Sequence, residues 1–167
     1  MYSERPIIKL SPSRTDRLLD VISLAILLLT WIYIIAEYFK LPAIIPTHFD
    51  LDGRIDDHGS KSVIFILPGI ITIVFAGMTI LNNYPNIFNY MKKITAENAE
   101  EQYSAATRLM RIIKLVITIF SLVLAFDIIN SAKTGISNLH WWVIPIFMIS
   151  MILPVIISLT VFRPGKK

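Results

Sequence analysis

The sequence has no cysteine and few charged residues. A chain without cysteine forms no disulfide, offers no thiolate to a metal ion and has no cysteine nucleophile. Asp, Glu, Lys and Arg together make up only 17% of the 167 residues, while apolar residues make up 54%. A soluble domain of this length needs more charge to cover its surface, so the composition favours one compact domain surrounded by lipid.

Several functional motifs are absent as well. The sequence contains no phosphate-binding glycine loop, no nucleophile–base pattern and no nucleic-acid-binding motif. The net charge is +4, but in a membrane protein the distribution of the charges matters more than their sum. We therefore expect no nucleic-acid partner, and a role without catalysis is favoured over an enzymatic one.

Long apolar stretches are what the sequence has instead. A helix needs roughly 20 residues to cross the hydrocarbon core of a bilayer. Four segments reach this length, at residues 18–39, 63–81, 112–130 and 141–162. No small-x-small cleavage site follows Ile35, so the first segment is expected to remain as an anchor. The sequence predicts an all-α integral membrane protein whose single domain, residues 1–167, contains four transmembrane helices.

Lysine and arginine predict the orientation of these spans. Twelve of the 16 basic residues lie before the first span, between the second and third up to Lys114, or after the fourth. The other four lie between the first and second spans or between the third and fourth. Basic residues collect on the cytoplasmic side. We expect a multi-pass protein of the bacterial cytoplasmic membrane, with both termini and the loop 82–111 inside and the loop 40–62 outside.

Small and mildly polar residues form a stripe along each span. In the first span the stripe is Ser23, Thr30 and Glu37, and in the third it is Thr118, Ser121 and Ala125. Such stripes let helix backbones approach closely where lipid gives no hydrophobic drive for association. Helix packing explains the stripes better than a substrate path does.

The loop before the third span has the pattern of a helix start. Asn98 and Glu101 have the spacing of a capping box. Apolar side chains then recur at helical spacing, at Tyr103, Ala106, Met110 and Ile113. This pattern predicts an amphipathic helix on the inner membrane surface, with Arg108 and Arg111 near lipid headgroups. Lys114, at the start of the span, is expected to extend its long side chain to the interface.

The outer loop gathers polar residues that could carry chemistry. Within eleven residues it contains His48, Asp50, Asp52, Asp56, Asp57 and His58. Asp52-Gly53 is a tight-turn signal, so we expect a short β-hairpin. Ser60 is placed to cap the second span.

Three interpretations of this loop remain open. His48, His58 and Asp52 are suitable ligands for zinc or another divalent ion, but their spacing matches no established metal-site signature. The loop could instead recognise an external peptide, a lipid headgroup or a partner protein. The third interpretation is structural, with His48 and the aspartates forming hydrogen bonds that hold the hairpin together.

Two ionisable residues lie near the outer ends of spans, where an ionisable side chain is a candidate for function. Glu37 belongs to the first span and Asp127 to the third. They are expected either to point inward and form a small polar pocket with His48, or to pair with Lys40 and Lys133.

Most of the sequence resembles a family of bacterial membrane proteins called domain of unknown function 1648. The residues that carry the resemblance are Leu41-Pro42, Ile45-Pro46-Thr47-His48-Phe49, Gly53, Gly59-Ser60-Lys61, Phe88-Asn89-Tyr90, Ile94-Thr95, Glu97-Asn98-Ala99-Glu100, Gln102-Tyr103, Arg108-Leu109 and Lys114. The same domain forms the N-terminal part of SdpI-type immunity proteins. Those proteins protect the producing cell from a secreted peptide toxin and hold a transcriptional repressor at the membrane. The resemblance brings no catalytic residues.

The leading hypothesis is a membrane-embedded binding or sensing module, or one related to toxin immunity. Its partners would be the bilayer and either an extracellular peptide or a cytoplasmic regulator, and it could form homo-oligomers. The alternatives are a metal-dependent membrane enzyme that uses the outer loop, and a small transporter or accessory subunit. The candidate binding residues are His48, Asp50, Asp52, Asp57, His58, Glu37 and Asp127.

Overall fold

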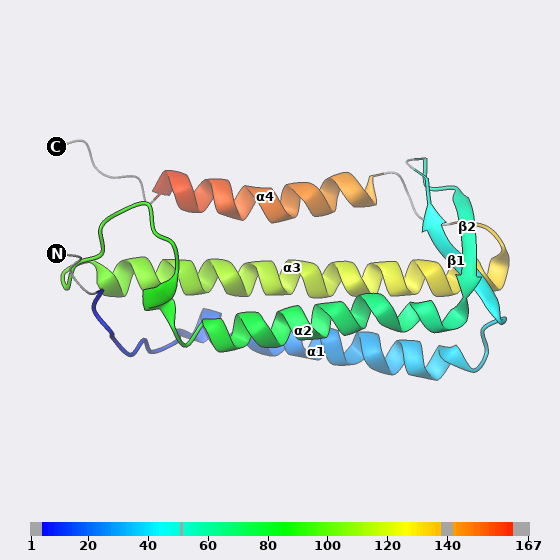
Figure 1. The fold of residues 1–167 in the computed structure, drawn as a ribbon, viewed down its shortest axis with the longest axis horizontal. Coiled ribbons are helices and arrows are strands. Elements are labelled where there is room, and N and C mark those ends of the chain that lie inside the picture. The colour runs from blue at the N-terminus through cyan, green and yellow to red at the C-terminus, as the bar shows by residue number, and fades with distance from the viewer. Residues whose placement is uncertain (1–4, 51, 138–141, 162–167) are drawn as a thin grey trace.

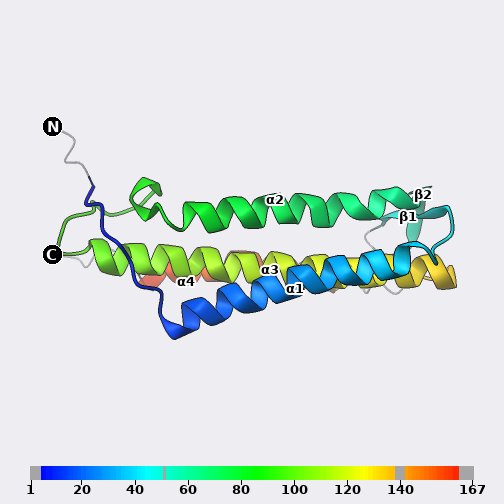
Figure 2. The same ribbon diagram turned by 90° about the horizontal axis from the view of Figure 1, so that it is seen from below.

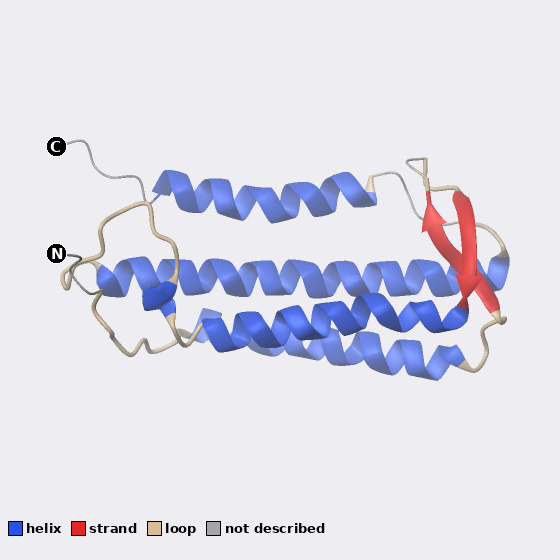
Figure 3. Ribbon diagram, in the orientation of Figure 1, coloured by secondary structure: helices blue, strands red, loops and turns tan. Residues whose placement is uncertain are grey.

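A computed structural model describes residues 5–50, 52–137 and 142–161 of the chain. Over these residues it has four α-helices, two β-strands and two short 3-10 turns. In chain order they are α1 (Arg14–Tyr38), β1 (Ile44–Phe49), β2 (Ile55–Ser60), η1 (Lys61–Phe65), α2 (Ile66–Leu81), η2 (Pro85–Ile87), α3 (Ala99–Thr134) and α4 (Val143–Val161). The helices run along the long axis of the molecule and the strands lie across one end (Figures 1 and 3).

We call the end that carries the strands the hairpin end and the opposite end the terminal end. The described parts of both chain termini lie at the terminal end (Figure 1). The order of helices and strands and the antiparallel pairing of β1 with β2 confirm the expectation of a mostly helical protein with a short hairpin.

Three helical segments are long and apolar enough to cross a membrane. They are Arg14–Tyr38, Lys61–Leu81 and Ala99–Thr134, and the fourth helix has a shorter apolar stretch, Val143–Ile157. The predicted ends of the fourth span, residues 141 and 162, lie outside the described residues. Large apolar side chains such as Leu28, Ile73 and Ile149 are more than half exposed on the outer faces of the helices. Such surfaces suit a lipid environment.

The helix starts differ in how they are capped. Ser13 and Asp16 form a capping box at α1, in which the Ser13 hydroxyl accepts from the Asp16 N–H at 3.2 Å. The helix α3 begins directly after Asn98, as the sequence predicts, but the expected capping box is wrong. The Asn98 side chain instead accepts from the Thr95 N–H at 2.9 Å and donates to the Lys93 carbonyl at 3.1 Å.

Small polar residues bring α1 and α3 together, and the two helices run alongside each other (Figure 2). The members of the two stripes other than Glu37 are buried: Ser23, Thr30, Thr118, Ser121 and Ala125. Ser23 and Thr30 donate their hydroxyl protons to carbonyls one turn earlier, at 2.6 and 2.9 Å. The hydroxyls of Ser23, Thr30 and Thr118 thus bond within their own helices while the backbones approach closely. The predicted role of these stripes in packing is confirmed.

The helix α3 is one continuous element of 36 residues. At about 1.5 Å per residue it is longer than the roughly 30 Å of a hydrocarbon core. The predicted amphipathic helix and the third span are therefore parts of one helix. The predicted apolar face of this helix, Tyr103, Ala106, Met110 and Ile113, is wrong after Tyr103. The buried residues that follow are Thr107, Arg111 and Lys114, while Ala106, Met110 and Ile113 are only half-buried.

Each end of the helical bundle has its own apolar core. At the hairpin end the core consists of Ile34, Leu41, Ile45, Ile64, Ala125 and Ile129. At the terminal end Ile94, Ala99 and Tyr103 pack with Tyr90 and with the segment before α1. Burial in this core raises the pKa of the Tyr90 hydroxyl. The Tyr103 hydroxyl donates to the Pro6 carbonyl at 3.0 Å. The chain before α1 is thereby attached to the start of α3.

The hairpin is attached to the helices through β1. Ile45 is 1% exposed and belongs to the core at the hairpin end. At the turn, Gly53 has a φ of +81°, which favours glycine, and the expected Asp52-Gly53 turn is confirmed. The Ser60 hydroxyl accepts from the Ser62 N–H at 3.4 Å and caps η1, the short turn that leads into α2.

Candidate binding cavity

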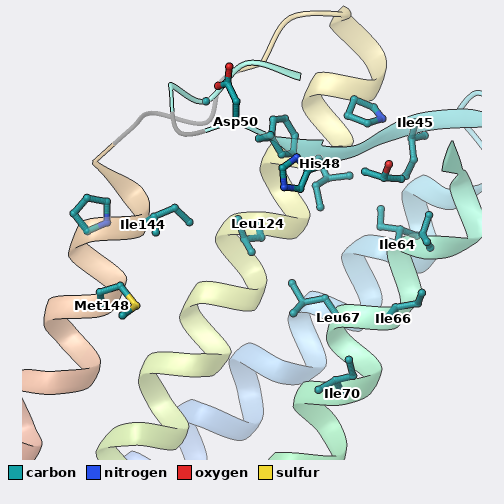
Figure 4. A pocket seen from close by; sticks show the side chains of 17 residues that line it. Ile45, His48, Asp50, Ile64, Ile66, Leu67, Ile70, Leu124, Ile144 and Met148 are labelled. Carbon is teal, nitrogen blue, oxygen red and sulfur yellow. The ribbon is translucent and has the colours of Figure 1, made fainter. Parts of the chain in front are cut away.

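A cavity of about 760 Å³ lies beneath the hairpin (Figure 4). Its walls come from β1, the hairpin turn, η1, α2, α3 and α4. The residues that line it are Ile45, Pro46, Thr47, His48, Phe49, Asp50, Gly53, Val63, Ile64, Ile66, Leu67, Ile70, Leu124, Ile128, Ile144, Pro145 and Met148. No described residue of α1 lines the cavity. The cavity is partly open. Its volume is typical of a site for a small molecule.

The lining changes from polar to apolar with depth. His48 and Asp50 lie at the hairpin, whereas Leu67, Ile70 and Met148 line the cavity further along the helices (Figure 4). Apolar walls with a few polar groups at one side are the usual composition of a ligand site. The arrangement suits a molecule with one polar end and one apolar end.

His48 is held in place by Asp56. The Nδ1 atom of His48 lies 2.6 Å from Oδ1 of Asp56, which comes from the neighbouring strand. When Nδ1–H of a neutral imidazole donates to a carboxylate, Nε2 remains as an acceptor. The hairpin therefore presents a histidine of fixed orientation at the cavity.

The aspartates have different roles. Asp50 shapes the turn, since its Oδ1 accepts from the N–H groups of Asp52 at 2.9 Å and Arg54 at 2.7 Å. Asp57 accepts from the N–H of His58 at 2.8 Å. Asp52, Asp57 and His58 are not among the described residues that line the cavity. Of the candidate binding residues, His48 and Asp50 are the two that the structure places there.

The structure does not bring together the expected metal ligands. Within residues 5–50, 52–137 and 142–161, no group of three or more His, Asp or Glu side chains is placed to hold a metal ion. His48 pairs with Asp56 rather than with His58 or Asp52. Zinc binding stays a prediction that metal analysis of the purified protein would test.

Glu37 and Asp127 lie apart from the cavity. Neither is among its described lining residues, so the cavity contains only His48 of the three residues expected to meet there. Glu37 pairs with Lys40 at 3.2 Å, as one of the alternatives predicts, and also with Lys133. Lys133 was expected to pair with Asp127, which is buried on α3. The ion pair between Glu37 and Lys133 instead connects α1 to α3.

A second polar cluster, which sequence reasoning missed, lies towards the terminal end. It consists of Asp16 and Asp20 of α1, Thr79 of α2, and Arg108, Arg111 and Lys114 of α3. Asp16 pairs with Arg108 at 2.9 Å and Asp20 pairs with Arg111 at 2.8 Å. Where contacts with lipid headgroups were expected, these two arginines form ion pairs within the protein.

Lys114 is the centre of this cluster. Its ammonium group bonds to Asp20 at 2.7 Å and to the Thr79 hydroxyl at 3.0 Å, and it lies 4.7 Å from the centre of the Phe75 ring. The residue is 1% exposed. The prediction that its side chain extends to the membrane interface is therefore wrong. A carboxylate partner on a neighbouring helix stabilises the charge inside the bundle.

Spacing contains a partial signal for this cluster. Asp16 and Asp20 are four residues apart, and Arg111 and Lys114 are three apart, so each pair lies on one face of its helix. Two acidic residues and two basic residues on faces that carry small-residue stripes predict an interhelical pairing.

Comparison with known proteins supports the resemblance in part. Residues 25–72 match the model of a family described as "Domain of unknown function (DUF1648)". An uncharacterized protein of the archaeon Archaeoglobus fulgidus is 28% identical over 146 residues, which cover 79% of this chain and 78% of the relative. No solved structure matches the chain. The family match contains the hairpin and the α2 residues of the cavity, whereas the relative's description names no activity.

Proposed function

We propose that this chain is a four-span membrane protein with a cytoplasmic N- and C-terminus, whose outer hairpin covers a ligand-binding cavity. Its function would be binding or sensing at the outer membrane surface. The observation that carries this proposal is the cavity itself, with apolar helix walls and with His48 and Asp50 at its hairpin side. The side chains of both residues form hydrogen bonds within the hairpin.

The proposed orientation is supported by charge and by shape. Twelve of 16 basic residues belong to the side that carries both termini. The described parts of both termini lie at the end of the bundle opposite the hairpin (Figure 1). Reporter fusions test this directly. A fusion after Lys167 should be active only inside the cell, and a reporter inserted at Gly53 only outside. The reverse pattern would reject the orientation.

Binding is tested by filling the cavity. Leu67 lines it, whereas Ile73 lies on the same helix with 74% of its surface exposed. Native mass spectrometry of protein purified from its membrane in mild detergent should detect a bound small molecule. The signal should disappear in Leu67→Trp and persist in the matched control Ile73→Trp. A cavity that is empty in every preparation would contradict the proposal.

The toxin-immunity version of the proposal has its own test. If the cavity recognises a secreted peptide, cells that lack this protein should become sensitive to that peptide, and His48→Ala should fail to restore resistance. The immunity version is rejected if the deletion strain grows as well as its parent strain beside cells that secrete the peptide.

A further inference from the structure

The walls of the cavity point to an apolar chain as part of the ligand. Three helices contribute Leu67 and Ile70 from α2, Leu124 from α3 and Met148 from α4. All four side chains are apolar, and α2 and α4 flank α3 (Figure 1). Apolar helix walls of this kind suit an apolar chain, and the bilayer is a ready source of such chains.

The charge of the hairpin points to a cationic head. Between Ile44 and Ser60 the chain has four aspartates and one arginine, which gives this segment a net charge of −3 when its histidines are neutral. Asp50 lines the cavity itself, and Asp56 holds His48 at its edge. An ammonium group is attracted by this charge, while a head that carries only negative charge is repelled.

The size of the cavity suits a small molecule better than a folded peptide. A volume of about 760 Å³ lies within the range of roughly 300–1,000 Å³ that is usual for small-molecule sites. One lipid chain with its head at the hairpin fits that range.

We propose that the ligand is a bilayer amphiphile whose head carries an ammonium group. Its chain occupies the space between α2, α3 and α4, and its ammonium group lies at His48 and Asp50 beneath the hairpin. This inference rests on the proposed function and names the ligand class for the same cavity.

The test compares two amphiphiles that share one palmitoyl chain. Palmitoyl lysophosphatidylethanolamine carries an ammonium group, and palmitoyl lysophosphatidylglycerol does not. The full-length protein in a neutral detergent is titrated with each, and binding is measured by native mass spectrometry. We expect the ethanolamine lipid to bind at least tenfold more tightly.

Two variants separate the contribution of the chain from that of the head. Leu67→Trp should weaken both lipids about tenfold, because the indole occupies the space for the chain. Asp50→Asn keeps the oxygen that accepts the turn N–H groups but removes the charge. It should bring the ethanolamine lipid to the affinity of the glycerol lipid. Ile73→Trp should leave both affinities unchanged.

The outcomes distinguish the two levels of the proposal. Equal binding of both lipids, blocked by Leu67→Trp, would overturn the ammonium head and leave the cavity as a binding site. Tighter binding of a cationic amphipathic peptide than of the ethanolamine lipid would overturn the lipid as occupant. Binding of neither lipid, or binding that Leu67→Trp does not change, would overturn the ammonium amphiphile as the ligand, whereas the proposed function falls only if the cavity is empty in every preparation.

Discussion

The ammonium group of Lys114 lies 2.7 Å from Oδ1 of Asp20, although the two residues are 94 positions apart in the sequence. The contact joins α1 to α3 in a part of the bundle where Lys114 is almost fully buried. A buried charge that loses its partner is far more costly than one that keeps it.

Neutralising Asp20 should therefore destabilise the bundle more than neutralising Lys114. In Asp20→Asn the buried ammonium loses its carboxylate and keeps the Thr79 hydroxyl and the Phe75 ring, and we expect a loss of about 3 kcal/mol in the free energy of unfolding. In Lys114→Met, Asp20 still pairs with Arg111, so the loss should be smaller. Unfolding by a denaturing detergent in mixed micelles measures both.

The double variant and an exposed control complete this test. Asp20→Asn with Lys114→Met should recover part of the stability lost in Asp20→Asn alone, because the buried ammonium is then absent and only Arg111 lacks its Asp20 partner. Asp52→Asn changes an exposed carboxylate 3.8 Å from Arg54 and should have little effect. A loss in Asp20→Asn no larger than in Asp52→Asn would contradict the buried pair.

The hairpin should not tolerate a methyl group at Gly59. A Cβ atom built there would lie 2.9 Å from Cγ2 of Thr47 on the opposite strand. Gly59→Ala should cost about 1–3 kcal/mol through overpacking and speed hydrogen exchange in the hairpin. Thr47→Ser, which removes Cγ2, should rescue Gly59→Ala. The matched control is Gly69→Ala, because Gly69 has open space around it. Unchanged exchange in Gly59→Ala would contradict the close packing of the two strands.

The hydrogen bond between Trp31 and Thr72 should contribute to the packing of α1 on α2. The indole Nε1–H donates to the Thr72 hydroxyl at 2.9 Å. Thr72→Val keeps the shape and removes the acceptor, so we expect a loss of about 1 kcal/mol, as for interhelical hydrogen bonds in membranes. In a Trp31→Phe background the same change should cost clearly less. Equal costs in both backgrounds would show that the bond is not the cause.

At the hairpin end, Glu37 should matter more than Lys40. Glu37 pairs with both Lys40 and Lys133, whereas Lys40 is largely exposed. Glu37→Gln should lower the unfolding midpoint more than Lys40→Gln, because only Glu37→Gln removes the contact between α1 and α3. Added salt should reduce the difference between them, since it screens exposed charges. Equal midpoints at low salt would count against this contact.

The parts of the fold that the sequence predicted are those with a local cause. The lengths of apolar stretches predicted the helices, Asp52-Gly53 predicted the hairpin turn, and stripes of small residues with Ser23 and Thr118 predicted which helix faces are buried in packing. Each depends on neighbours within a few turns of the chain, and the structure confirms each.

The parts that the sequence did not predict depend on partners that residue spacing alone does not identify. Asn98 begins α3, but its side chain bonds to nearby backbone groups instead of capping the helix. Lys114 has a side chain long enough for the interface, yet Asp20 holds it inside the bundle. The cavity required three helices and the hairpin to be positioned together, so no single segment could reveal that His48 and Asp50 share it.

The uninterrupted course of α3 limits how the two ends of the molecule can move. Near one end its Ala125 and Ile129 pack in the same core as Ile45, and near the other its Tyr103 holds the Pro6 carbonyl. Both cores are therefore built on one continuous helix of 36 residues. Any tilt of α3 beneath the hairpin would therefore also displace its far end, because no break in the helix separates the two cores.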